Sequence, residues 1–169
     1  EIIPELSQDF SEIFGRSAAG EDDYKGLVTK YQLDDAEVVL VALGSVLGTI
    51  KDAVDQQRAN GVKVGVLGIT SFRPFPLDEV RKSLKQAQRI VVVERAFAPG
   101  IGGIVSSNIR TALSGIDTKI NTVVAGLGGR PITLKAISEL VEKALYGSLP
   151  EFSFMDLDVE LVERELERS

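Results

Sequence analysis

Cysteine and histidine are both absent from the 169-residue sequence. Without cysteine the chain has no disulfide, no thiolate nucleophile and no thiolate ligand for an iron–sulfur cluster. Without histidine it lacks the commonest general base and the commonest metal-ligating side chain. There is no serine nucleophile motif either, so nucleophilic catalysis by this chain alone is not expected. We therefore predict no catalytic residue and no metal site on it.

Long apolar runs and basic clusters are missing as well. No run approaches the roughly 20 apolar residues that a membrane span needs, and Glu1-Ile2-Ile3-Pro4 does not resemble a secretory signal. With 19 basic and 25 acidic residues the net charge is −6, and no basic stripe indicates nucleic-acid binding. These features predict a cytoplasmic protein with neither a membrane nor a nucleic acid as partner. Because the chain does not begin with Met, we interpret it as a segment of a longer polypeptide.

The sequence does contain a regular alternation of strand-like and helix-like segments. The strand-like runs are residues 27–33, 38–43, 62–69, 89–93 and 119–125. The helix-like runs, each with apolar residues at helical spacing, are residues 46–59, 77–87, 101–113 and 133–146, the last with Thr133 as N-cap. This alternation predicts an α/β fold with a parallel sheet covered on both faces. The Asp34-Asp35 connection is too short for a parallel crossover, so residues 27–33 are predicted to run antiparallel.

The chain divides into three parts by composition. Residues 1–24 are interpreted as a lead-in or linker from a preceding domain, with a short helix around residues 7–14. Residues 25–147 form the predicted domain. Residues 148–169 are an acidic C-terminal tail, predicted to be helical, and residues 156–169 carry six acids and two arginines beside a narrow apolar stripe. That stripe fits either a helix resting on its own domain or a helix that docks on a partner chain.

The loop formed by residues 70–76 has unusual chemistry for a connector. Two prolines fix their own φ angles and restrict the residues before them, so the loop is stiff. It displays Phe72, Arg73 and Phe75. These residues fit an interface with another domain or subunit, where aromatic residues are enriched. They also fit a ligand site in which the arginine neutralises a phosphate or carboxylate and the rings stack on a ligand ring.

Three further loops are predicted at the carboxyl ends of the strands, the edge where open α/β sheets bind ligands. They are rich in glycine, so their backbone N–H groups are able to face an anion. Glycines needed only to turn the chain explain the pattern as well, and Glu94 with Arg95 fits either a functional pair or a local ion pair. The candidate interface or ligand contacts on these loops are Ser45, Glu94, Arg95, Gly100, Gly102, Gly103, Gly128, Gly129 and Arg130.

Three segments occur together in a characteristic order. They are Ser71-Phe72-Arg73-Pro74-Phe75-Pro76, then Glu94-Arg95 with Gly100-Ile101-Gly102-Gly103, then Gly126-Leu127-Gly128-Gly129-Arg130-Pro131-Ile132-Thr133. With the order of strands and helices, they make residues 27–146 resemble the C-terminal, transketolase-like part of the α subunit of pyruvate:ferredoxin oxidoreductase and related 2-oxoacid:ferredoxin oxidoreductases. That family commonly has Gly-Arg-Asp after the paired glycines, whereas this chain has Arg130-Pro131, so no polar role is carried over to this position.

The resemblance implies a three-layer α/β/α fold with a five-stranded mixed sheet in the order 1-3-2-4-5, strand one antiparallel. It also implies a place in an enzyme that oxidatively decarboxylates a 2-oxoacid, with pyruvate expected, forms an acyl-CoA and passes electrons to ferredoxin. In that enzyme thiamine diphosphate with Mg and the 4Fe–4S clusters lie on other domains or subunits, and CoA is used there. No cofactor is therefore expected on this chain alone, and the isolated chain is expected to be inactive.

We therefore expect a non-catalytic domain that serves assembly of the oxidoreductase. The implied partners are the other domains of the α subunit, the other subunits, ferredoxin for the whole complex, and a further copy in an oligomer. Two alternatives stay open at this point. The glycine loops fit a regulatory module that binds CoA or another phosphate-bearing ligand. The same fold fits the equivalent domain of a pyruvate dehydrogenase β subunit, a transketolase or a deoxyxylulose-phosphate synthase.

Overall fold

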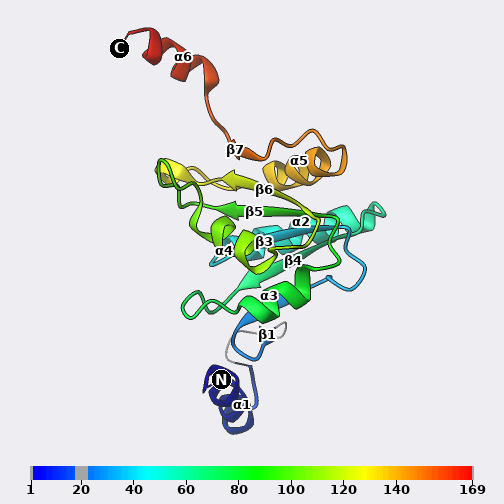
Figure 1. The fold of residues 1–169 in the computed structure, drawn as a ribbon. Coiled ribbons are helices and arrows are strands. Elements are labelled where there is room, and N and C mark those ends of the chain that lie inside the picture. The colour runs from blue at the N-terminus through cyan, green and yellow to red at the C-terminus, as the bar shows by residue number, and fades with distance from the viewer. Residues whose placement is uncertain (1, 18–22, 169) are drawn as a thin grey trace.

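In the computed structural model, which describes residues 2–17 and 23–168, a seven-stranded sheet lies between two layers of helices (Figure 1). The strands are Asp23–Tyr24 (β1), Val28–Tyr31 (β2), Val38–Ala42 (β3), Val64–Ile69 (β4), Arg89–Glu94 (β5), Lys119–Val124 (β6) and Phe152–Phe154 (β7). Their order across the sheet is β1-β2-β4-β3-β5-β6-β7.

The longer strands have the predicted arrangement. β2 pairs antiparallel with β4, whereas β4, β3, β5 and β6 pair in parallel, which confirms the order 1-3-2-4-5 with strand one antiparallel. The sequence does not predict the edge strands β1 and β7, because segments of two and three residues are too short to show a periodic pattern. β7 pairs in parallel with β6 and lies within the tail that the sequence pattern predicts to be helical.

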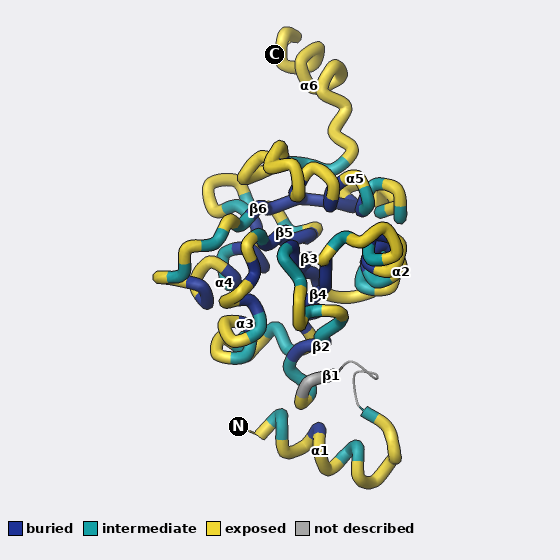
Figure 2. The backbone as a smooth tube through the Cα atoms, turned by 90° about the vertical axis from the view of Figure 1, so that its right-hand side faces the viewer, coloured by how far each residue is buried: buried dark blue, intermediate teal, exposed yellow. Residues whose placement is uncertain are grey.

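Four amphipathic helices form the two outer layers. They are Val46–Ala59 (α2) and Leu134–Leu145 (α5) on one face, and Leu77–Leu84 (α3) and Ile104–Ala112 (α4) on the other. Along β3, Val38 and Leu40 pack toward α2 and α5, whereas Val39 and Val41 pack toward α3 and α4. Figure 2 shows the strands buried between the helices. The predicted parallel sheet with both faces covered is therefore confirmed.

Two glycines in β4 allow neighbouring segments to pack directly on its backbone. A Cβ on Gly65 would overlap the carbonyl group of Gln32. A Cβ on Gly68 would overlap Thr29 Oγ1 of β2 and lie 2.8 Å from Leu47 Cδ1 of α2. The antiparallel strand and the first crossover helix thus approach β4 more closely than a side chain would permit.

Two helices lie outside the three layers (Figure 1). They are Ile2–Phe14 (α1), beyond the β1 edge, and Val159–Glu167 (α6), which follows β7 and buries no residue. α6 is exposed along its length in Figure 2. Residues 18–22, within the predicted lead-in, lie outside the described residues. In the part of the chain that is described, no helix is both long and apolar enough to cross a membrane.

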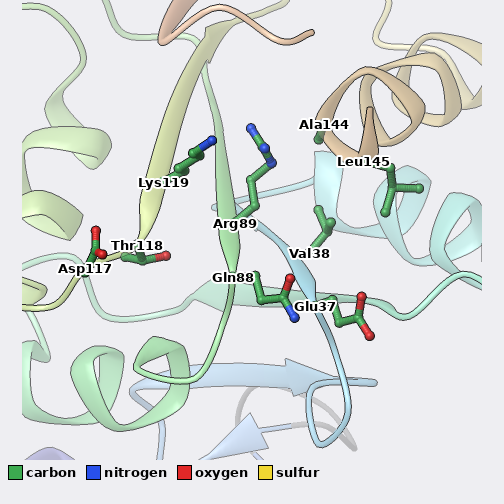
Figure 3. Close-up of a pocket in the computed structure, with 9 residues that line it drawn as sticks. All are labelled: Glu37, Val38, Gln88, Arg89, Asp117, Thr118, Lys119, Ala144 and Leu145. Atoms are coloured by element: carbon green, nitrogen blue, oxygen red, sulfur yellow. The ribbon is translucent and has the colours of Figure 1, made fainter. Parts of the chain in front are cut away.

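The parallel strands give the sheet two different edges. The carboxyl ends of β3, β5 and β6 continue into the glycine loops, and β4 continues into residues 70–76. The amino ends of β3, β5 and β6 border a pocket of about 450 Å³ beside the last turn of α5 (Figure 3). The residues that line this pocket are Glu37, Val38, Gln88, Arg89, Asp117, Thr118, Lys119, Ala144 and Leu145.

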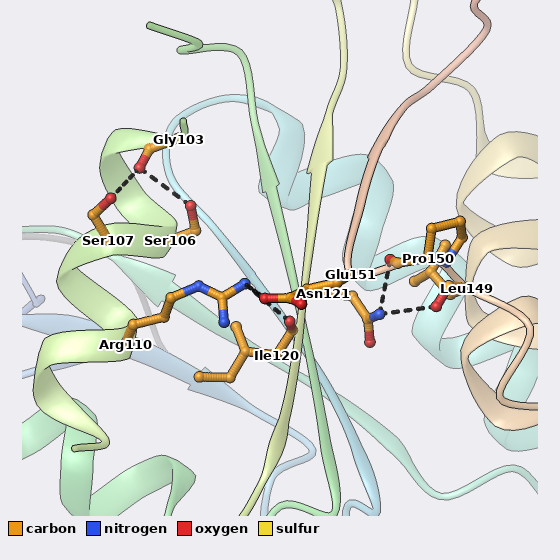
Figure 4. Close-up of polar contacts among 9 residues, drawn as sticks. All are labelled: Gly103, Ser106, Ser107, Arg110, Ile120, Asn121, Leu149, Pro150 and Glu151. Carbon is orange, nitrogen blue, oxygen red and sulfur yellow. Dashed lines mark hydrogen bonds and ion pairs between the residues drawn. The ribbon is translucent and has the colours of Figure 1, made fainter. Parts of the chain in front are cut away.

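A buried asparagine attaches the β7 edge to the sheet. Asn121 of β6 is 5% exposed, and its Nδ2 donates to the carbonyl oxygens of Leu149 at 3.0 Å and Pro150 at 2.9 Å (Figure 4). On the other face of β6, Arg110 of α4 forms an ion pair with Glu151 at 3.1 Å. Side chains from two elements therefore hold the turn that leads into β7.

Arg58 near the end of α2 fixes the turn before β3. Its Nε donates to the carbonyl oxygen of Val64 at 2.7 Å, and its Nη2 donates to that of Gln32 at 2.6 Å. Nη2 also donates to Asp35 Oδ1 at 2.7 Å, and this hydrogen bond, with the positive charge behind it, holds the pKa of Asp35 below its ordinary value. The short connection between β2 and β3 is thereby tied to α2 and β4.

Candidate functional site

The aromatic loop, residues 70–76, is held on its own domain by hydrogen bonds at its start and by two packed rings. The N–H groups of its first two residues both donate to the carbonyl oxygen of Leu27, at 3.1 and 3.0 Å. Phe72 and Phe75 are half-buried, meet edge to face with ring centroids 6.0 Å apart, and pack on the core beneath α3 and α4. These two rings therefore hold the loop on its own domain.

Arg73 is the exposed tip of the aromatic loop. Its guanidinium lies over the Phe72 ring, with Cζ 4.1 Å from the centroid, and Nη1 donates to the Phe72 carbonyl oxygen at 2.7 Å. Nη1 also lies 3.5 Å from Asn108 Oδ1 of α4. No ion pair to Arg73 is present among the described residues. A held cation without a counter-charge on its own domain is suited to an acidic group on a neighbour.

Glu94, at the carboxyl end of β5, is buried and caps a helix. Its Oε2 accepts from the N–H of Val105 at 2.8 Å and its Oε1 from that of Ser106 at 3.0 Å. The carboxylate thus meets the positive end of the α4 dipole. Gly103 makes this contact possible, because a Cβ at that position would collide with Glu94 Oε1. Glu94 is therefore committed to the cap of α4.

The helices that follow two of the glycine loops are capped from within the chain. Glu94 accepts from the N–H groups of Val105 and Ser106, the second and third residues of α4. Thr133 caps α5 as predicted, since its Oγ1 accepts from the N–H of Ala136 at 3.1 Å. The Gly102 N–H donates to the Ala98 carbonyl oxygen at 2.8 Å, which closes a turn before α4 and makes that helix start later than predicted. An external phosphate would have to compete with these internal bonds.

Four glycines predicted as contacts turn the chain in conformations that other residues rarely adopt. Their φ angles lie between 64° and 85°. Arg130, directly after the third glycine loop, donates to the carbonyl oxygen of Asp156 and so ties this loop to the segment after β7. The glycines are Gly100, Gly102, Gly128 and Gly129.

A cleft of about 370 Å³ opens where the strand order switches between β3 and β5. Ser45, the residue before α2, lines it and forms no side-chain cap with the helix. Arg95 lines the cleft as well, with a guanidinium nitrogen 3.3 Å from where a Cβ on Gly126 would lie. Most of the remaining wall is apolar. The fold rule for open α/β sheets places a ligand at such a switch point.

Exposed apolar side chains are gathered on the loops around this cleft. Phe97, on the loop after β5, packs against Phe152 and Phe154 of β7 with ring centroids 5.4 and 5.3 Å apart. This aromatic cluster is not predicted from the sequence, because two of its members lie in a strand with no periodic signal. The large exposed apolar residues on these loops, on the first turn of α4 and on β7 are together called the apolar patch: Leu43, Phe97, Ile101, Ile104, Leu127 and Phe152. A patch of this kind is typical of a contact surface.

The predicted residues thus fall into two groups on one edge of the sheet. Ser45, Arg95 and Arg130 follow β3, β5 and β6 and lie on the loops that carry the apolar patch. Arg73 follows β4, and its side chain extends toward α4, which covers the face of the sheet opposite α2 and α5. Glu94 and the aromatic rings at 72 and 75 serve the domain itself. The arginines are therefore the candidates for contact with a partner.

Comparison with protein families matches residues 36–137 to the Pyruvate:ferredoxin oxidoreductase core domain II. The chain belongs to this family. The matched range runs from just before β3 into α5 and includes the aromatic loop and all three glycine loops. The resemblance stated from the sequence motifs is therefore confirmed.

Curated relatives of this core domain II chain are oxidoreductase subunits. Pyruvate synthase subunit PorA of Methanosarcina barkeri is 36% identical over 167 residues, covering 95% of this chain and 40% of its relative. PorA of Thermotoga maritima is 37% identical over 150 residues, covering 88% of this chain and 36% of its relative. Ketoisovalerate oxidoreductase subunit VorA of Pyrococcus abyssi is 35% identical over 149 residues, covering 85% and 36%. The chain thus spans 40% or less of the length of these relatives.

Two solved structures share the fold. One is a 2-oxoglutarate:ferredoxin oxidoreductase from Magnetococcus marinus with 2-oxoglutarate, coenzyme A and succinyl-CoA bound, with a TM-score of 0.54 and 24% identity over 66% of this chain and 18% of that chain. The other is a split gene transketolase in an inactive beta4 tetramer, with a TM-score of 0.53 and 20% identity over 77% and 48%. The likeness concerns the fold alone, and it confirms the transketolase-like architecture.

The donor atoms of the core domain do not fit the two metal-containing groups, iron–sulfur clusters and Mg²⁺, that the resemblance implies for a whole enzyme. The chain has no cysteine to ligate an iron–sulfur cluster. Among the described residues no three Asp or Glu side chains converge as a metal-binding group, although Mg²⁺ prefers such oxygen ligands. We therefore derive no reaction step from residues of this chain.

Proposed function

We propose that this chain is an assembly domain of the α subunit of a thiamine-diphosphate-dependent 2-oxoacid:ferredoxin oxidoreductase, with pyruvate as the 2-oxoacid. Family membership and the oxidoreductase subunits among its relatives support the enzyme class. Decarboxylation, acyl-CoA formation and electron transfer to ferredoxin would take place on other domains or subunits. The exposed apolar patch on the carboxyl edge is the observation that carries the assembly role.

The patch has the properties of a protein contact. Ile101 is 74% exposed and stands on a turn that a bridge between Ala98 and Gly102 closes. Leu127 is 43% exposed on a short 3₁₀ turn between β6 and α5. Apolar side chains on rigid loops bind with little loss of conformational entropy. Arg73 and Arg95 lie on the same edge and would meet acidic groups of the other α-subunit domains or the other subunits.

Substitution of the patch tests this role. In the parent subunit, co-expressed with its partner subunits, Ile101→Ser with Leu127→Ser should weaken assembly by about 10- to 100-fold, as expected for contact residues. The unfolding midpoint of the isolated chain should not change, because both side chains are exposed. Size-exclusion chromatography measures assembly, and pyruvate-dependent ferredoxin reduction measures activity.

Tyr146→Ser is the matched control, since Tyr146 is 86% exposed and follows α5 at the opposite edge of the sheet. Normal assembly and activity of the Ile101→Ser, Leu127→Ser variant would overturn the contact role. Equal effects in the control variant would do so as well.

The CoA-binding alternative has less support. Two N–H groups in the first turn of α4, those of Val105 and Ser106, are already bonded to Glu94, and α5 is capped by Thr133. The equivalent domain of a pyruvate dehydrogenase β subunit or a transketolase is also less well supported, because the family match is to the ferredoxin-dependent enzymes.

A further inference from the structure

Two cations lie side by side at the amino edge of the sheet. This edge is opposite the carboxyl edge, which carries the apolar patch. Arg89 and Lys119 are the first residues of β5 and β6 and are direct partners in the parallel register. Neighbouring strands are about 4.8 Å apart, and paired residues point to the same face. Figure 3 shows both side chains rising toward the gap beside the end of α5. Like charges placed directly opposite each other destabilise a sheet unless something compensates them.

The described residues supply little compensation. Neither Arg89 nor Lys119 forms an ion pair in the described part of the chain. The bond from Arg89 Nη1 to Asn121 Oδ1 is long, at 3.5 Å. Arg89 lies close to Gly147, where α5 ends, but a helix C-terminus carries only about half a negative charge. The two side chains together therefore keep a net positive charge.

The two acids that line the same pocket do not cancel this charge. Glu37 forms an ion pair with Lys63 at 3.4 Å. Asp117 is exposed and in Figure 3 lies below the cationic ends of Arg89 and Lys119. The positive charge thus faces the pocket that the amino edge encloses.

The pocket has the size and walls of a small-ligand site. Its volume of about 450 Å³ falls within the roughly 300–1,000 Å³ that is usual for such sites. Val38, Ala144 and Leu145 give it an apolar side next to the cations. An arginine fork beside a lysine suits an anion with several acceptor oxygens, and phosphate matches that geometry.

We propose that this pocket binds a small phosphate-bearing anion, held by Arg89 and Lys119 with the rest of the molecule against the apolar wall. The proposal is independent of the assembly role, since the pocket lies at the other end of the strands. It also differs from the switch-point site that the fold rule predicts at the carboxyl edge.

Calorimetric titration of the full chain with pyrophosphate tests the proposal. One equivalent should bind, and the affinity should fall as salt is raised because the attraction is between charges. Arg89→Gln and Lys119→Gln should each weaken binding by about tenfold or more, the usual effect of losing one charged hydrogen bond. Lys85→Gln removes the same charge from an exposed site at the end of α3 and should leave binding unchanged.

Three results would overturn the proposal. The first is the absence of heat at about 1 mM pyrophosphate in low salt. The second is an equal loss of affinity in Lys85→Gln, which would indicate only general attraction by the surface. The third is succinate binding as tightly as pyrophosphate, which would show a carboxylate site. A melting experiment without ligand tests the repulsion between the paired cations separately: Lys119→Gln should raise the unfolding midpoint, and a lowered midpoint would contradict that repulsion.

Discussion

The carboxylate of Glu94 lies in the space that a Cβ on Gly103 would occupy, and it accepts two hydrogen bonds from N–H groups in the first turn of α4. The absence of a side chain at Gly103 leaves space for the Glu94 carboxylate. The carboxylate in turn accepts hydrogen bonds from backbone N–H groups of α4 that have no partner within the helix. The Gly102-Gly103 pair has the appearance of an anion-binding loop in the sequence. In the structure the anion it accommodates is a side chain of the same domain.

Gly103→Ala should therefore be far more damaging than an ordinary glycine substitution. It would displace a buried carboxylate from its donors, at a cost of roughly 3–5 kcal/mol in the free energy of unfolding. Gly100→Ala is the control, since that position faces open space and only its positive φ is strained, at about 1–2 kcal/mol. Urea denaturation of the isolated chain measures both. Equal losses would contradict the contact with Glu94.

Asn121→Asp should destabilise the β7 edge. The substitution removes both N–H donors and places a carboxylate against the carbonyl oxygens of Leu149 and Pro150. Leaving such buried acceptors unsatisfied costs about 1–3 kcal/mol, and more beside a charged group. Asn60→Asp, at the exposed end of α2, makes the same chemical change and should cost less than about 0.5 kcal/mol. Thermal unfolding of the two variants distinguishes these outcomes.

The stability of the chain should fall in acid partly through Asp35. Its pKa is lowered in the folded state, chiefly by the hydrogen bond from Arg58, so the unfolded state binds the proton more readily. The stabilising contribution is present above the ordinary value of about 3.9 and is lost as the pH falls through the lower folded pKa. The excess stability of the wild type over Asp35→Asn, measured by urea denaturation, should shrink below about pH 4.

Asp34→Asn is the control for this experiment, because Asp34 forms no ion pair among the described residues. The difference in the free energy of unfolding between the wild type and Asp34→Asn should change less over the same pH range. A wild-type advantage over Asp35→Asn that grows in acid would contradict the assigned sign.

Phe75→Ala should lower the stability of the isolated chain, whereas Arg73→Ala should weaken assembly of the complex. Phe75 packs on the core beneath α3 and α4, so its truncation should lower the free energy of unfolding by about 2–3 kcal/mol. Arg73 is exposed, so its removal should change stability by less than about 0.5 kcal/mol. In the co-expressed complex, however, Arg73→Ala should weaken assembly. Denaturation of the isolated chain and size-exclusion chromatography of the complex separate the two effects.

The parts of the fold that the sequence predicts are those with a repeated pattern. Five strands and four helices are long enough to show apolar spacing, and the brevity of Asp34-Asp35 determines the direction of β2. β7 has no such pattern. It depends on bonds between distant residues, among them the Thr122 N–H to the Glu151 carbonyl oxygen at 2.7 Å and the Met155 N–H to that of Val124 at 2.8 Å. No local sequence signal records those contacts.

The location of the candidate site could be predicted from the sequence, but the contacts that each of its residues makes could not. The rule for parallel sheets places Arg73, Arg95 and Arg130 at one edge, and the structure shows them there. The partner of Glu94 is the backbone of a helix 11 residues later, and backbone donors have no sequence signature. The cluster around Phe97 forms only because β7 brings its partners alongside.

Because the aromatic loop is hydrogen-bonded to Leu27, directly before β2, local unfolding of β2 and release of the loop are coupled. Among the described residues, β2 pairs on its outer side with the two-residue β1 alone, so it should open by local unfolding more often than the central strands. Each opening that includes Leu27 releases the two N–H groups that hold the loop. A partner that immobilises Arg73 must therefore also slow amide exchange in β2, and the strength of the contact becomes measurable at a strand that the partner does not touch.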